Sequence, residues 1–193
     1  MCNKKFLIGF IGPLITILLI FLDVSISPYF SWYKNSLSSL GVYRYFFIFD
    51  SAVIIGGISI FIFALFLYKY LAVKMLSIAF IMTGAVSLFL IGIFDENFGN
   101  IHLAIAVIYF IFTPIGIILF SLYRIKPFLS YYGYISGILS LTIIIFGIFA
   151  LFGYINVRIG LSVTEMLEAI LLSSWSSLVG IYLCRHPSKL MKN

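Results

Sequence analysis

The chain has 193 residues, of which 63% are hydrophobic and 9% are charged, and its formal net charge is +6. Soluble domains usually carry about 25% charged residues, so this composition leaves too little polar surface to face water. It excludes soluble globular, disordered, fibrous and disulfide-stapled proteins. What it predicts is an α-helical protein that crosses a membrane several times.

Six apolar stretches are long enough to cross a bilayer, whose hydrocarbon core of about 30 Å needs about 20 residues of helix. They cover residues 6–26, 46–68, 75–94, 101–123, 131–153 and 163–184. Short polar segments separate most of them. Stretches such as 78–93 are apolar on every side, unlike the alternating strands of a membrane β-barrel. We therefore predict an all-α, six-helix transmembrane bundle that forms one domain over residues 1–193.

Small residues within these stretches indicate where helices approach one another. Gly133 and Gly137 give a small-xxx-small face in the fifth stretch, and Gly56 and Gly57 lie together in the second. Such faces let helix backbones come close inside a membrane. We interpret these glycines as packing positions.

The basic residues predict the orientation, because Lys and Arg in short loops favour the cytoplasmic side. With the N-terminus inside, six spans place nine basic residues on the inner side and three on the outer side. The inner set is Lys4, Lys5, Lys69, Lys74, Arg124, Lys126, Arg185, Lys189 and Lys192, and the outer set is Lys34, Arg44 and Arg158. We predict a multi-pass protein of the cell membrane with both termini in the cytoplasm. No loop offers a basic patch with room for a nucleic acid, so none is expected as a partner.

The two cysteines, Cys2 and Cys184, both fall on the cytoplasmic side in this topology. That compartment is reducing, so we expect no disulfide. Their spacing is not that of metal ligands. We expect two ordinary thiols.

All six acidic residues lie near the predicted outer face. They are Asp23, Asp50, Asp95, Glu96, Glu165 and Glu168, and His102 begins the fourth stretch beside them. The run from Ser162 to Glu165 matches a capping box, and Asp50 lies in a first helical turn, where the helix dipole favours an anion. Glu168 lies deeper, about 9 Å along the helix from Ser162. A carboxyl at that depth must face the bundle or a wet cavity.

The longest connection, residues 27–45, is rich in aromatic and hydroxyl side chains. Aromatic rings suit the headgroup level of a bilayer. Asn35 or Ser36 can cap a short helix that Gly41 ends. We predict a short re-entrant or surface-lying segment that covers the outer end of the bundle.

Three features together resemble a known family. They are the pattern Asn-Ser-x-Ser-x-Leu-Gly at 35–41, the run 92–96 with Asp95 and Glu96, and the following His102. The chain resembles the six-span bacterial and archaeal membrane family designated domain of unknown function 998, and more distantly it is similar to the Frag1, DRAM and Sfk1 group. The resemblance covers most of the chain. It implies the six-span architecture but no settled activity.

The first functional hypothesis is a membrane protein that binds a lipid or a small amphiphile in an outward-facing cavity with a polar rim. The candidate polar site is Asn35, Ser36, Ser39, Asp50, Asp95, Glu96, His102 and Glu168. We expect four of these side chains, those of Asp50, Asp95, His102 and Glu168, to converge near the outer face. The partners implied are membrane lipid and a small amphiphilic ligand. The sequence leaves the identity of any cofactor unknown.

Two alternatives remain open at this point. In a metal-assisted lipid hydrolase, His102, Asp95 and Glu168 would supply metal ligands. Without a metal, Ser36 or Ser39 would be the nucleophile and His102 the base. In a small-molecule or proton-coupled transporter, the intramembrane acids would mark the pathway, although no charge lies near the bilayer midplane. The sequence leaves both enzyme and non-enzyme readings open.

Overall fold

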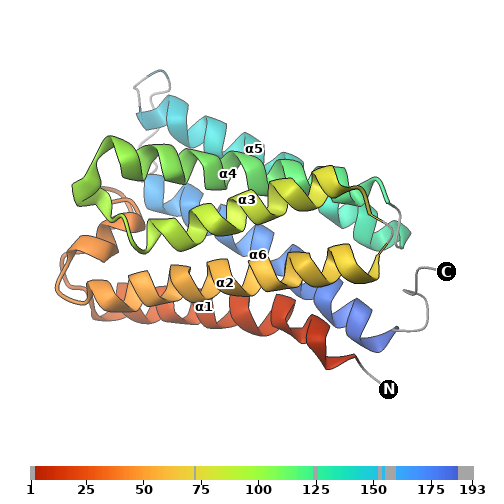
Figure 1. Cartoon of the computed structure of the whole chain (residues 1–193). Coiled ribbons are helices and arrows are strands. Elements are labelled where there is room, and N and C mark those ends of the chain that lie inside the picture. The colour runs from red at the N-terminus through yellow and green to blue at the C-terminus, as the bar shows by residue number, and fades with distance from the viewer. Residues whose placement is uncertain (1–2, 72, 124–125, 152–153, 155–159, 187–193) are drawn as a thin grey trace.

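The structure is a computed structural model that describes residues 3–71, 73–123, 126–151, 154 and 160–186. Six α-helices run up and down through this part of the chain (Figure 1). They are α1 (Ile8–Ile26), α2 (Phe46–Tyr70), α3 (Met75–Ile91), α4 (Asn100–Ser121), α5 (Pro127–Leu151) and α6 (Leu161–Arg185). Three short 3-10 helices accompany them, η1 (Lys4–Leu7), η2 (Ser38–Val42) and η3 (Glu96–Phe98).

The helices form a closed ring in chain order, because each packs against the next and α6 returns to pack against α1. The start of η1 and the end of α6 therefore lie at the same end of the bundle (Figure 1). The Asn3 backbone N–H donates to the Cys184 carbonyl oxygen at 3.0 Å there. We call this the terminal end and the opposite one the acidic end, since the acidic residues lie there.

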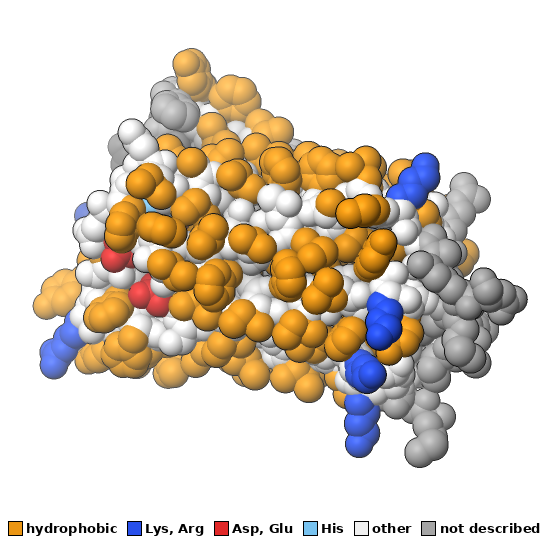
Figure 2. Space-filling view, in the orientation of Figure 1, with side chains coloured by type: hydrophobic (Ala, Val, Ile, Leu, Met, Phe, Trp, Pro, Cys, Tyr) orange, Lys and Arg blue, Asp and Glu red, His pale blue; other side chains and the backbone are white. Residues whose placement is uncertain are grey.

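The face of the ring seen in Figure 2 is largely apolar between its two ends, as a surface in contact with lipid requires. Five helices are long and apolar enough to cross a membrane, and α3 is a shorter apolar helix. Within a helix every backbone polar group finds a partner in the same segment, which is what a bilayer demands. The prediction of an all-α, multi-pass membrane bundle is confirmed.

Two helix boundaries differ from the prediction by several residues. Helix α3 ends at Ile91 instead of residue 94, because the backbone N–H groups of Ile93 and Phe94 both turn back to the Leu90 carbonyl oxygen. A Cβ at Gly92 would lie 2.7 Å from the Asp50 carbonyl oxygen, so only glycine permits this approach. Helix α5 begins at residue 127 instead of 131. Proline suits the first position of a helix because its missing N–H would be unpaired there anyway.

The glycines singled out in the sequence do mark close approaches. A Cβ at Gly57 would lie 2.6 Å from the Phe89 backbone nitrogen on α3. A Cβ at Gly137 would lie 2.9 Å from the Pro114 carbonyl oxygen on α4. The packing interpretation is confirmed at these two positions.

The basic side chains of the described residues divide between the two ends (Figure 2). Those at the terminal end are Lys4, Lys5, Lys69, Lys74, Lys126 and Arg185, and those at the acidic end are Lys34 and Arg44. Arg124, Arg158, Lys189 and Lys192 lie outside the described residues. The charge segregation that the sequence predicts is thus reproduced for the residues that the structure describes.

Cys184, at the terminal end, is disulfide-bonded. The expectation of an ordinary thiol at this position is therefore wrong. Cys2 lies outside the described residues. A disulfide is typical of an oxidising compartment, whereas the basic residues of this end favour the cytoplasm. The orientation of the bundle is therefore a point for direct measurement.

Candidate functional site

The segment between α1 and α2 folds over the acidic end of the bundle, and we call its residues 31–42 the cap segment. Ser162, at the start of α6, holds the cap segment through two hydrogen bonds. Its hydroxyl donates to the Trp32 carbonyl oxygen at 2.9 Å, and its backbone N–H donates to the Asn35 carbonyl oxygen at 3.2 Å. A Cβ at Gly160 would overlap the Trp32 carbonyl oxygen, so the contact requires glycine. The predicted covering segment is confirmed, and it is anchored rather than loose.

Glu96 is a second anchor of the cap segment. Its Oε1 accepts hydrogen bonds from the hydroxyls of Ser36 and Ser38, the latter at 2.7 Å. The Ser36 oxygen also accepts from the Ser39 N–H at 3.2 Å, and the Ser39 hydroxyl donates to the Ser36 carbonyl oxygen at 2.7 Å. We predicted that Asn35 or Ser36 would cap a short helix. Of these two residues, Ser36 is the one whose side chain accepts a backbone N–H in the first turn of η2. That helix ends at Val42, one residue after Gly41.

Asn35 stabilises the cap segment from within. Its Oδ1 accepts from the Ser31 N–H at 2.8 Å, and its Nδ2 donates to the Tyr43 hydroxyl at 2.9 Å. Both ends of the side-chain amide are therefore occupied by protein groups. This arrangement assigns Asn35 a structural part in the site.

Glu165 belongs to this site, and the capping-box interpretation missed it. Helix α6 begins after Gly160 with no side-chain cap, so that interpretation is wrong. The Ser162 hydroxyl is already bound to Trp32, and the Glu165 Oε2 instead accepts the Leu37 backbone N–H at 2.5 Å. The buried Glu165 side chain therefore joins α6 to the cap segment.

Beneath the cap segment lies a cavity of about 90 Å³ between α1, α2, α3, α4 and α6. Ser38, His102 and Glu165 line it at the acidic end, and most of its remaining wall is apolar. On α4 the lining runs from His102 to Ile117, a rise of about 22 Å. Half of the hydrocarbon core is about 15 Å, so the lining residues extend over more than the depth of one leaflet.

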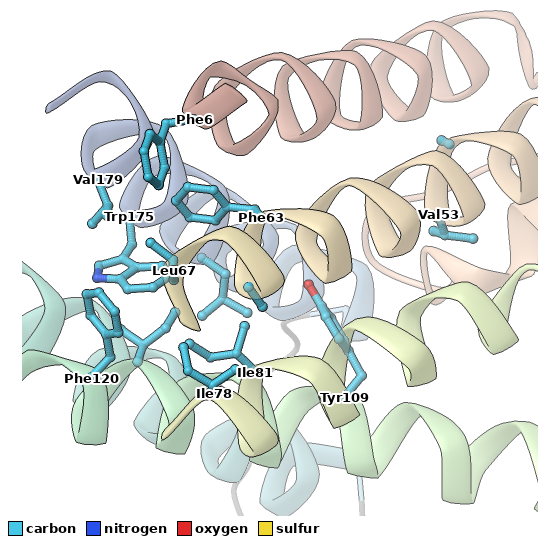
Figure 3. Close-up of a cluster of buried hydrophobic side chains, with 14 of the residues drawn as sticks. Phe6, Val53, Phe63, Leu67, Ile78, Ile81, Tyr109, Phe120, Trp175 and Val179 are labelled. Carbon is cyan, nitrogen blue, oxygen red and sulfur yellow. The ribbon is translucent and has the colours of Figure 1, made fainter. Parts of the chain in front are cut away.

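Buried side chains from several helices form the deeper wall of this cavity (Figure 3). Val53 on α2, Ile81 on α3, Tyr109 on α4 and Trp175 on α6 all contribute to it. Figure 3 shows the Tyr109 ring directed from α4 toward the middle of the bundle, with its hydroxyl leading. Trp175 is 2% exposed and packs edge-on against Phe120 at 5.3 Å between ring centroids. The wall is therefore closed to the surrounding lipid at this depth.

His102 brings an imidazole to the polar end of the cavity. Its Nδ1 lies 2.6 Å from the Phe94 carbonyl oxygen. A carbonyl oxygen only accepts hydrogen bonds, so Nδ1 carries the hydrogen. In the neutral ring Nε2 is then an acceptor, which a ligand with a hydroxyl or amine can use.

Three carboxyls form a separate group at the acidic end. Asp23 accepts the Ser27 hydroxyl at 2.9 Å, and this bond ties the last turn of α1 to the residue that follows it. The Asp50 carboxyl is close enough to Asp23 and Asp95 to feel their charges. Among the described residues, Asp50 Oδ1 and Asp23 Oδ2 have no hydrogen-bond partner.

The eight residues of the predicted site therefore fall into distinct groups. Asn35, Ser36, Ser39 and Glu96 build the cap, Asp50 and Asp95 join Asp23, and His102 lines the cavity. Glu168 is fully buried, and it interacts electrostatically with Glu165 and with Tyr109. The four side chains that we expected to converge therefore lie in different places. Asp50 and Asp95 belong to the group of three carboxyls, His102 lines the cavity, and Glu168 is buried between α6 and its neighbours.

The arrangement needed for hydrolysis is not assembled within the described part of the chain. No three His, Cys, Asp or Glu side chains in it are placed to hold a metal ion, and this includes His102, Asp95 and Glu168. The hydroxyls of Ser36 and Ser39 donate to Glu96 and to a backbone carbonyl instead of His102. The polar groups at this end are therefore organised to close the bundle and to line a cavity.

The fold and the site define a polytopic α-helical membrane protein whose ring of helices encloses an apolar cavity with polar groups at one end. Over residues 10–182 the chain matches the family described as protein of unknown function DUF998, and it belongs to that family. The resemblance carried by residues 35–41, 92–96 and His102 is confirmed. Comparison with curated proteins and with solved structures finds no match.

Proposed function

We propose that this membrane protein binds a lipid or a small amphiphile in the cavity beneath the cap segment. The polar end of the ligand lies in the part of the cavity nearest the cap segment, which Ser38, His102 and Glu165 line, and its chain runs between the helices toward Trp175. One observation carries this proposal: the cavity wall is apolar over most of its length and polar at one end. An amphiphile has the same division, and sites between bundle helices commonly combine apolar walls with a few polar groups.

The polar end decides which ligand binds. Burying a CH2 group taken from water is favourable by about 0.8 kcal/mol, but a chain already in the bilayer has left water. Lipid tails are as apolar as the cavity wall, so moving a chain between them changes little. Headgroup contacts must therefore supply most of the selectivity.

We infer that the acidic end faces the outside of the cell membrane, with both termini in the cytoplasm. The basic residues at the terminal end support this orientation. The test uses a C2S/C184S background that carries either Lys34→Cys or Lys69→Cys. A membrane-impermeant maleimide should label the first variant in intact cells and the second only after permeabilisation. The opposite pattern would reverse the orientation.

The test of binding compares two phenylalanine substitutions at neighbouring positions of α6. Ala169 lines the cavity, whereas Ile170 is 42% exposed toward lipid. Native mass spectrometry of protein purified in mild detergent should find a bound lipid or amphiphile in the wild type and in Ile170→Phe. Ala169→Phe should lose it, because the ring fills the space. A wild type without any bound amphiphile, or equal retention in both variants, would refute the proposal.

A further inference from the structure

Glu168 is a carboxyl without a partner inside the bundle. It is fully buried, and neither of its side-chain oxygens has a hydrogen bond among the described residues. It shares one face of α6 with Glu165, Leu172 and Trp175, at the spacing of three, four and seven residues that aligns side chains on a helix. Those three residues line the cavity. A buried carboxyl at membrane depth is costly unless a partner satisfies it, so the position itself indicates a function.

Within the described part of the chain, the recorded electrostatic neighbours of Glu168 are acidic or phenolic. Glu165 lies about one turn away toward the cap segment and interacts electrostatically with Glu168. Tyr109 also feels the Glu168 charge and lines the cavity. The residues that line the cavity include no lysine or arginine. A bound molecule can supply the positive partner that this lining lacks.

A second unpaired polar group lies at the level of Glu168 on α5. The Tyr132 and Ser174 hydroxyls meet at 2.6 Å, and a Cβ at Gly147 would lie 2.8 Å from the Thr164 hydroxyl oxygen. These two contacts fix the antiparallel register of α5 and α6, and Ser140 falls opposite Glu168 between them. Ser140 is fully buried, and its hydroxyl has no partner among the described residues. Ser140 on α5 and Glu168 on α6 are thus two buried polar groups at the same level of the bundle.

Resting on the proposed function, we propose that the cavity ligand carries a protonated amine and that Glu168 binds it, with the Tyr109 and Ser140 hydroxyls beside it. An ammonium group offers three N–H donors and one positive charge. It satisfies the Glu168 oxygens and offsets the charge that Glu168 shares with Glu165. A carboxylate or phosphate headgroup would instead bring a like charge close to both side chains.

The geometry also says how the amine reaches this point. Glu168 does not line the cavity, but its neighbour Tyr109 does, so binding requires the Tyr109 side chain to move aside. From Glu168 to Ser176, the last cavity-lining residue on α6, the helix rises about 12 Å. The ligand chain occupies this deeper part of the cavity. The ring of Trp175 borders it there.

Trp175 is therefore a built-in reporter of occupancy. It lies about 10 Å beyond Glu168, and surrounding lipid does not reach it because it is 2% exposed. The chain has one other tryptophan, Trp32 in the cap segment, which Trp32→Phe removes. A bromine atom at mid-chain quenches tryptophan fluorescence on contact. Quenching in the Trp32→Phe protein thus reports a chain inside the cavity.

The experiment compares octadecylamine, octadecanol and stearate, each brominated at mid-chain, in neutral nanodiscs at neutral pH. The amine should reach half-quenching of Trp175 at a mole fraction about tenfold or more below that of the alcohol, the factor expected of a hydrogen bond to a charged group. Glu168→Gln in the same background should abolish this advantage, so that the amine and the alcohol reach half-quenching at similar mole fractions.

The other outcomes are separable. Equal quenching by amine and alcohol, unaffected by Glu168→Gln, would overturn the amine inference while supporting a cavity that binds amphiphiles. No quenching by any of the three compounds would overturn the proposed function as well. If Glu168→Gln does not fold, Tyr109→Phe and Ser140→Ala replace it. Each should weaken the amine selectively by a smaller factor, and no change in either would overturn the assignment.

Discussion

The contact between Glu165 and Leu37 closes the cap segment on α6, and replacing Glu165 with alanine tests its strength. The substitution leaves the Leu37 N–H without an acceptor, and Leu37 is 5% exposed. An unsatisfied buried donor costs about 1–3 kcal/mol. Because the bonds of Ser162 and Glu96 to the cap segment remain, this cost falls on local opening of the cap. It corresponds to a rise of about 5- to 150-fold in the open population.

Amide hydrogen exchange measures this opening directly, since exchange of a protected amide follows the local opening equilibrium. The peptide that contains Leu37 should exchange faster in Glu165→Ala by the factor above. Glu165→Gln retains a carbonyl oxygen as acceptor and should raise exchange much less. Unchanged exchange in Glu165→Ala would refute the anchoring role of Glu165. So would an equal rise in peptides from the middle of α2, because it would indicate global destabilisation.

Three further predictions concern packing and charge. Ser38→Ala should lower the free energy of unfolding by about 0.5–1.5 kcal/mol, because it removes the hydrogen bond to Glu96. In a Glu96→Ala background the same substitution should cause no further loss. Additive losses would show that Ser38 and Glu96 act separately. Asp23→Ala leaves the buried Ser27 hydroxyl without its acceptor and should cost about 1–3 kcal/mol, whereas Asp23→Asn retains an acceptor and removes one of three neighbouring charges. Equal melting temperatures for these two variants would contradict the role of Asp23 as the acceptor for Ser27. Gly57→Val places methyl groups against the α3 backbone and should lower the melting temperature by about 2–12 °C, while the lipid-facing Ile58→Val should change it little.

The helices could be predicted because the bilayer fixes the length of each apolar run. The starts of α2 and α3 agree with the prediction, and the ends of α1 and α6 lie within one residue of it. The early end of α3 was missed because it depends on how closely Gly92 approaches Asp50 in α2. The early start of α5 was missed because proline is common both in loops and at the first position of a helix, so Pro127 does not distinguish the two.

The candidate site could be predicted only as far as its composition and its end of the bundle. Glu165 looks like half of a capping box with Ser162, yet its partner is Leu37, which is 128 residues away in the chain. A local pattern does not reveal such a contact. The placement of Ser140 at the level of Glu168 depends on helix register, and the cavity depends on closure of the whole ring. The Cys184 disulfide was missed because the predicted topology places this residue in the cytoplasm, where thiols are kept reduced.

The most direct test of the account is fluorescence quenching of Trp175 by mid-chain-brominated octadecanol in the Trp32→Phe protein, with and without Ala169→Phe. The account predicts strong quenching when the cavity is open and little when the phenylalanine ring fills it. The variant with Ile170→Phe should behave like the open protein. Equal quenching with and without Ala169→Phe, or none in the open protein, would contradict the claim that this ring of helices holds an amphiphile.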